Sequence, residues 1–162
     1  MKTIIPFCLT LTILLGSAGM SASADFQKGL TAYESGDYAT ALREWYPLAE
    51  QGHATAQTNL GVMYHYGKGV PKDHKTAAKW YRLAAEQGNA DAQTNLGVMY
   101  TNGEGVTRDY VYAYMWLNIA ASNGDKEASR IRDILARRTP DADISAAQKL
   151  ARECIRKKYK GC

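Results

Sequence analysis

Apolar residues recur along this chain at the three- and four-residue spacing that is typical of amphipathic helices. Between residues 54 and 66, one apolar face consists of Ala56, Leu60, Met63 and Tyr64. Paired Gly and a Pro interrupt the pattern at residues 67–71. A second apolar stripe then consists of Ala77, Trp80, Tyr81 and Ala84. Because Asp73 can cap the second helix and Gly88 can end it, the pattern predicts a helix–loop–helix hairpin.

The hairpin pattern occurs twice, 36 residues apart. Residues 54–70 read ATAQTNLGVMYHYGKGV and residues 90–106 read ADAQTNLGVMYTNGEGV, with 13 of 17 positions identical. The same spacing relates Trp80 to Trp116 and Gly88 to Gly124. A fixed period of this size is typical of stacked repeats, because one hairpin cannot bury its apolar face alone.

The repeated motif reads A-x-A-Q-x-N-L-G-x-M-Y-x-x-G-x-G-V-x-x-D-x-x-x-A-x-x-W-Y-x-x-A-A-E-Q-G-x-A. It resembles the Sel-one-like repeat, a relative of the tetratricopeptide repeat, most closely over residues 54–125. This resemblance implies an all-α fold, a right-handed α-solenoid of about four antiparallel helix hairpins. It also implies an adaptor or scaffold for other proteins, since the family consists mostly of such proteins, many of them in bacterial envelopes.

The chain divides into an N-terminal leader and one repeat domain, residues 25–162. Residues 25–53 form a divergent first repeat without the Gly-x-Gly loop, and residues 54–89 and 90–125 form the two matching repeats. Residues 126–162 are expected to form a C-terminal helix pair that caps the array. Such a cap is required because the last repeat of a solenoid must turn a polar face to water.

Residues 1–24 are predicted to be a cleaved secretory signal peptide. Lys2 precedes an apolar run from Ile4 to Leu15, and Ala22-Ser23-Ala24 fits an A-x-A cleavage site. The alternative is an uncleaved membrane anchor, which the short apolar run disfavours. We therefore expect a periplasmic or secreted protein with no integral membrane segment after cleavage.

Two cysteines, Cys154 and Cys162, follow the predicted leader. An exported protein meets an oxidising compartment, so a disulfide between them is one expectation and two free thiols are the other. The disulfide-rich branch of the family carries paired cysteines in each repeat, and such pairs are absent here.

Charge is distributed unevenly along the chain. Residues 25–125 carry 8 basic and 11 acidic side chains, whereas residues 126–162 carry 11 basic and 5 acidic ones. A candidate basic contact face on the last helix consists of Lys149, Arg152, Arg156 and Lys157. This face is either the polar outside of a cap or a docking surface for an acidic partner, anionic lipid or cell-wall polymer. The net charge is too mild to indicate a nucleic-acid partner.

The sequence contains none of the catalytic motifs S-x-x-K, G-x-S-x-G and H-E-x-x-H after the leader. His65 and His74 flank the first Gly-rich loop and could approach each other, but Thr101 and Tyr110 hold the equivalent positions in the second copy. The Gly-x-Gly loops lack the remaining residues of nucleotide-binding motifs. We therefore expect no enzyme activity, no cofactor and no metal site.

The leading hypothesis is an exported protein–protein interaction scaffold that presents a concave helical surface to a protein or peptide partner. The first helix of each hairpin would supply this surface through Thr58, Val62, His65, Thr94, Val98 and Thr101. One alternative is a structural envelope component that binds anionic polymer or lipid through the basic C-terminal helix. A cell-wall or β-lactam hydrolase, an activity associated with cysteine-rich relatives, is the other.

Overall fold

The computed structural model describes residues 24–162, and within that range the secondary structure consists of eight α-helices. The helices are α1 (Phe26–Glu34), α2 (Tyr38–Glu50), α3 (Ala54–Tyr66), α4 (His74–Ala85), α5 (Ala90–Asn102), α6 (Tyr110–Ser122), α7 (Lys126–Ala136) and α8 (Asp141–Arg156). The expected all-α solenoid is confirmed. Residues 1–23 of the predicted leader lie outside the described residues.

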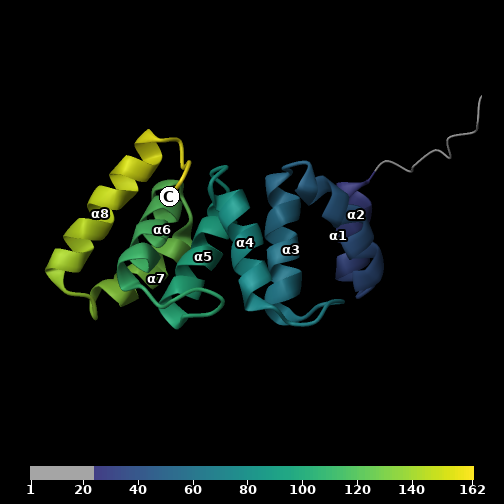
Figure 1. Ribbon diagram of the computed structural model, residues 1–162, viewed down its shortest axis with the longest axis horizontal. Helices are drawn as coiled ribbons and strands as arrows, with labels where there is room; N and C mark the ends of the chain where they lie inside the picture. Colours follow the sequence, from purple (N-terminus) through teal and green to yellow (C-terminus); the bar gives the residue numbers. More distant parts are fainter. Residues whose placement is uncertain (1–23) are drawn as a thin grey trace, which may run out of the picture.

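The hairpins follow one another along the long axis of the molecule (Figure 1). Helix α1 packs on α2, α3 on α4, and α5 on α6, while α2 also contacts α3 and α4 contacts α5. The last pair differs from a hairpin, because α7 and α8 each pack mainly on α6. They therefore close the array together as a cap. In the part of the chain that the structure describes, no helix is long and apolar enough to span a bilayer.

A glycine in the first helix of each hairpin lies directly against a large side chain of the second helix. A Cβ atom on Gly61 would meet the Tyr81 ring at 2.5 Å, and one on Gly97 would meet Leu117 Cγ at 2.7 Å. The divergent first hairpin repeats the contact, with Gly29 against Trp45. Because the glycine lacks a side chain, the two helices can pack closely around the large residue.

Buried glutamines link successive hairpins through hydrogen bonds. Gln57 Nε2 donates to the carbonyl oxygen of Ala49 at the end of α2 (2.9 Å), and Gln87 donates to Gln57 Oε1 (2.7 Å). One repeat later, Gln93 donates in the same way to Ala85 (3.1 Å) and accepts from Asn123 (3.3 Å). These bonds satisfy buried polar groups that would otherwise cost stability.

Each Gly-x-Gly loop lies against the first turn of the preceding second helix. A Cβ on Gly105 would collide with the carbonyl oxygen of His74, and one on Gly69 would collide with Tyr38 in the same way. Both glycines have positive φ, a conformation that glycine adopts readily. Asp73 caps α4 as predicted, because its Oδ1 accepts hydrogen bonds from the amides of Lys75 and Thr76.

The C-terminal tail folds back over the preceding repeats. Cys154 in α8 and Cys162 are joined by a disulfide, with their Cα atoms 5.7 Å apart. Between them, the Tyr159 hydroxyl lies within hydrogen-bond distance of Asn123, and the Tyr159 ring lies against Gly88. The tail therefore contacts the ends of two repeats that precede the cap.

Replacing Gly61 with alanine is expected to destabilise the protein, although alanine is the better helix former. The helix-propensity gain of about 1 kcal/mol is outweighed by overpacking against the buried Tyr81 ring, which costs about 1–3 kcal/mol. Chemical denaturation would measure the change in the free energy of unfolding. Thr55→Ala, at an exposed position of the same helix, is the control and should leave stability unchanged or raise it slightly. Equal or greater stability of Gly61→Ala would contradict the close-contact account.

The disulfide predicts that protein recovered from an oxidising compartment, once the leader with Cys8 has been removed, carries no free thiol. Intact-mass measurement after alkylation without reductant should show no modified cysteine, and modification of both after reduction. Cys162→Ser should speed amide hydrogen exchange around Tyr159 while leaving exchange in α3–α6 unchanged. Two alkylated cysteines in unreduced protein would show that the bridge does not form.

Candidate functional site

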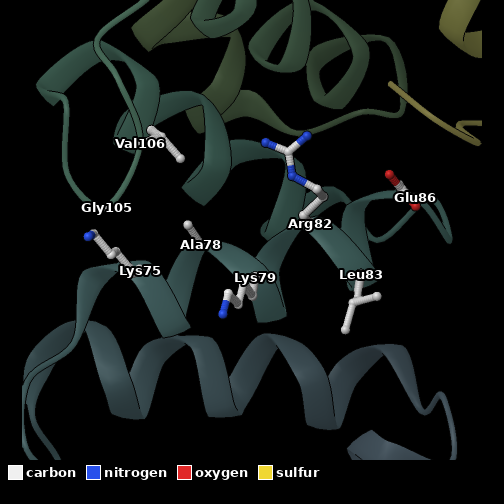
Figure 2. Close-up of a pocket in the computed structure, with 8 residues that line it drawn as sticks. All are labelled: Lys75, Ala78, Lys79, Arg82, Leu83, Glu86, Gly105 and Val106. Atoms are coloured by element: carbon white, nitrogen blue, oxygen red, sulfur yellow. The ribbon is translucent and has the colours of Figure 1, made fainter.

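One side of α4 faces a groove of 520 Å³, called here the α4 groove (Figure 2). Helix α4 lines it with a single stripe of residues, and the α5–α6 loop lines the opposite side. The lining residues are Lys75, Ala78, Lys79, Arg82, Leu83, Glu86, Gly105 and Val106. The groove therefore lies between two consecutive repeats, where the close loop contact at Gly105 brings Val106 near α4.

The α4 groove combines an apolar base with a mainly cationic lining. Leu83 is 47% exposed, although leucine is usually buried in proteins. Arg82 donates a hydrogen bond through Nη2 to the Tyr100 hydroxyl, and its guanidinium carbon lies 5.9 Å from the centre of that ring. The Tyr100 ring stacks in turn on Tyr112 at 5.4 Å. These contacts hold the Arg82 guanidinium in place beside the groove.

A second groove of 270 Å³ lies on the other side of α4 and is called here the aromatic groove. Its lining residues are Tyr46, Tyr64, Thr76, Lys79, Trp80 and Leu83. Tyr46 and Trp80 meet edge to face with ring centroids 6.0 Å apart, and the nearby Glu50 carboxylate raises the pKa of Tyr46. Since Lys79 and Leu83 line both grooves, the two form one surface that extends from α2 across α4.

The structure removes Thr58 and Thr94 from the predicted contact surface. Both side chains are buried, and Thr58 Oγ1 donates to the Ala54 carbonyl oxygen at 3.0 Å. Thr94 Oγ1 donates to Asp125 Oδ2 at 2.6 Å, which ties α5 to the start of α7. Neither threonine can therefore contact a partner directly, because neighbouring helices cover both positions.

The other four predicted contact residues are partly exposed but have different surroundings. Val62 lines a hollow of 100 Å³ with residues of α1 and α2, and Val98 is half-buried on α5. Thr101 donates to the carbonyl oxygen of Gly97. His65 Nε2 lies 3.8 Å from Glu104 Oε2. Burial lowers the pKa of His65, and the Glu104 carboxylate only partly opposes this effect.

The predicted basic face remains open to solvent. Lys149, Arg152, Arg156 and Lys157 are all exposed, and among the described residues none of them forms an ion pair. The opposite side of α8 buries Ala147, Ala151 and Cys154 toward the core. The face is therefore compatible with a cap and with a contact surface.

The grooves beside α4 are not where the sequence predicts the binding surface, which is on the first helix of each hairpin. The one sequence signal for these grooves is Leu83, an apolar residue outside the inward stripe of α4. That signal is weak, since single exposed apolar residues are common on protein surfaces.

Comparison with known proteins identifies the repeats. A family model described as the Sel1 repeat matches residues 54–89 and 90–125. A 34-residue stretch is 53% identical to an uncharacterised protein of Neisseria meningitidis serogroup B, and it covers 21% of this chain and 7% of that protein.

Two solved structures share the fold. A protective antigen present in uropathogenic Escherichia coli strains, which displays an SLR fold, is 35% identical with a TM-score of 0.77. The match covers 81% of this chain and 29% of the antigen. A Sel1 repeat protein from Oxalobacter formigenes is 33% identical with a TM-score of 0.66, over 68% of this chain and 46% of that one. This chain thus spans less than half the length of each relative. Residues 54–125 are therefore two consecutive Sel1 repeats, and the chain around them has the SLR fold of Sel1 repeat proteins.

Proposed function

We propose that this chain is an exported scaffold that binds a segment of another protein along α4. Sel1 repeats usually mediate protein–protein interactions, which supports binding as the general role. The observation that carries the choice of surface is the half-exposed Leu83, which lines both grooves together with Lys79.

The lining of the α4 groove indicates the chemistry of the partner. Three cationic side chains face one carboxylate, so a partner segment that carries Asp or Glu would be attracted to it. Arg82 suits a carboxylate especially well, because its planar guanidinium can donate two parallel hydrogen bonds. Leu83 and Val106 would bury an apolar side chain of the same segment.

The aromatic groove extends this surface toward α2. Tyr46 is 40% exposed and lies against Trp80, so the two rings offer a rigid apolar contact. Tyrosine and tryptophan are enriched at protein interfaces because they bury a large area with few rotatable bonds. A partner that fills both grooves would therefore contact three consecutive repeats.

The proposed export rests on the composition of residues 1–24. In the producing bacterium, a periplasmic or extracellular location would place the α4 surface among envelope and secreted proteins. The exposed basic face of α8 supports a second role, attachment to anionic envelope polymer or lipid. Attachment of that kind would weaken in high salt, because exposed charges are screened.

Leu83→Glu is expected to weaken partner binding without unfolding the protein, because Leu83 is already half in solvent. Crosslinked affinity capture from the native cell envelope would identify bound proteins, and titration of the main one would give its affinity. We expect at least a tenfold loss, or about 1.4 kcal/mol. Lys79→Glu should act in the same direction on an acidic partner.

Ile134→Glu supplies the matched control, since Ile134 is 44% exposed on α7 and lies outside both grooves. It should retain the affinity of the unmodified protein. Binding that survives both Leu83→Glu and Lys79→Glu would rule out this surface. Envelope retention that disappears in high salt, without a captured protein, would instead favour the basic face.

A further inference from the structure

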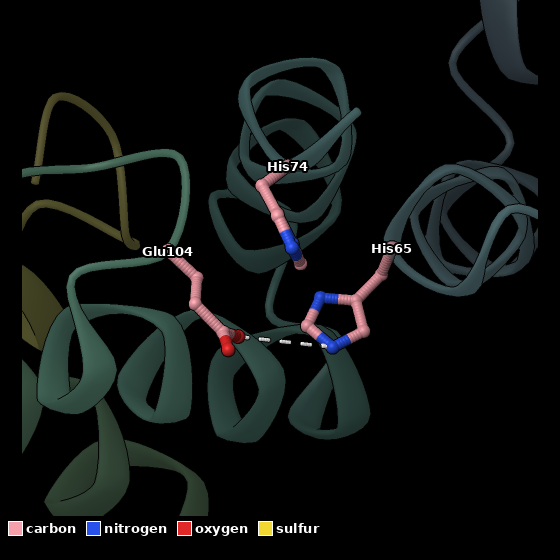
Figure 3. Close-up of side chains that lie close together, drawn as sticks. All are labelled: His65, His74 and Glu104. Atoms are coloured by element: carbon pink, nitrogen blue, oxygen red, sulfur yellow. Dashed lines mark ion pairs between the residues drawn. The ribbon is translucent and has the colours of Figure 1, made fainter. Parts of the chain in front are cut away.

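The junction between the two Sel1 repeats brings together two histidines and a glutamate (Figure 3). His65 is near the end of α3, His74 is the first residue of α4, and Glu104 belongs to the Gly-x-Gly loop of the next repeat. One potential ligand atom of each side chain lies within 4.8 Å of the other two. The imidazole rings meet edge to face with centroids 4.9 Å apart.

We propose that His65, His74 and Glu104 bind a divalent transition-metal ion, with zinc as the best match. Two imidazole nitrogens and one carboxylate oxygen are a ligand set that zinc accepts in tetrahedral sites. Imidazole ligands favour zinc, copper and nickel over magnesium and calcium, which prefer oxygen. Three protein ligands leave a fourth position for water or a partner's side chain.

The spacing of the ligand atoms suits this chemistry. Zinc bonds of 2.0–2.2 Å in a tetrahedron place ligand atoms about 3.3–3.6 Å apart. His65 Nε2 and Glu104 Oε2 are already 3.8 Å apart. All three residues are partly exposed, so small side-chain rotations can close the remaining distance. Glu104 in particular lies on the loop between α5 and α6.

Two ring nitrogens at this junction are buried without a hydrogen-bond partner, His65 Nδ1 and His74 Nδ1. Buried polar atoms in proteins nearly always have a partner. Within residues 24–162, the other buried side-chain nitrogen without a hydrogen-bond partner is Trp116 Nε1. Two of the three unpartnered nitrogens therefore lie at this junction. A metal ion bound through His74 Nδ1 would give that nitrogen the partner it lacks, whereas His65 offers one nitrogen to the metal, either Nδ1 or the Nε2 that lies near Glu104.

The junction between the first and second repeats shows that packing does not require two histidines and a glutamate at these positions. Tyr33 stands four residues after Gly29, as His65 does after Gly61, and Tyr38 and Lys68 match His74 and Glu104. There, the rings of Tyr33 and Tyr38 meet at 5.4 Å, and Lys68 Nζ lies 5.4 Å from the Tyr38 ring. The same backbone position thus holds an aromatic pair and a cation at one junction, and three potential metal ligands at the next.

Sequence alone gives only a weak metal signal here, because Thr101 and Tyr110 hold the positions of the two histidines in the second repeat. The third ligand comes from the following repeat, through the close contact between Gly105 and the start of α4. An ion held here would connect α3, α4 and the next loop, and so restrict motion between the two repeats.

Calorimetric titration of chelator-treated, tag-free protein with zinc chloride tests the proposal. We expect one zinc ion per chain and a zinc-dependent rise in melting temperature, because a ligand that binds the folded state stabilises it. His65→Tyr, His74→Tyr and Glu104→Lys each copy the preceding junction and should weaken zinc binding at least tenfold. Cobalt(II) should give tetrahedral absorption bands that these variants lose.

His53→Asn is the control, because it removes a histidine while keeping the cap that Asn89 provides at the equivalent position. Zinc affinity should be unchanged in this variant. The proposal is overturned by an absence of zinc binding, or by affinity that survives all three ligand substitutions. If circular dichroism shows that His65→Tyr or His74→Tyr unfolds, Glu104→Gln separates ligand loss from misfolding, because it is a mild change on a loop.

Discussion

The close contact between a glycine of one helix and a large side chain of the next underlies each hairpin of this protein. Trp45, Tyr81 and Leu117 fill equivalent positions against Gly29, Gly61 and Gly97. The large residue varies whereas the glycine does not. Different large side chains can fill the space between two closely packed helices, but that space leaves no room for a Cβ atom on the glycine. Small alanines around this contact complete the narrow interface.

A second close contact joins one repeat to the next. The Gly-x-Gly loop rests on the first turn of the preceding second helix, and only glycine combines positive φ with so near an approach. The residue between the two glycines is free to vary, as Lys68 and Glu104 show. Repeat-specific chemistry can thus be added to a constant backbone without disturbing the stacking.

Helical faces can be predicted from this sequence, but which of them is exposed to solvent cannot. Thr58 and Thr94 share a face with Val62 and Val98, yet both threonines are buried. The Thr58 hydroxyl donates to a carbonyl oxygen of its own helix, and the Thr94 hydroxyl donates to Asp125 at the start of α7. Leu83, by contrast, has charged neighbours on a helix that the sequence predicts to pack inside the array. Its side chain is half exposed and lines both grooves. Helical periodicity gives the direction of a side chain, whereas exposure depends on what covers it.

The sequence by itself determined the repeat period, the helical hairpins and the cap at Asp73, because periodicity, glycine pairs and capping act over a few residues. Tertiary structure decided three further features. It packed α7 and α8 together on α6, opened the grooves beside α4, and brought Glu104 to His65 and His74. These features depend on contacts between segments far apart in the chain, whose separation no local pattern reports.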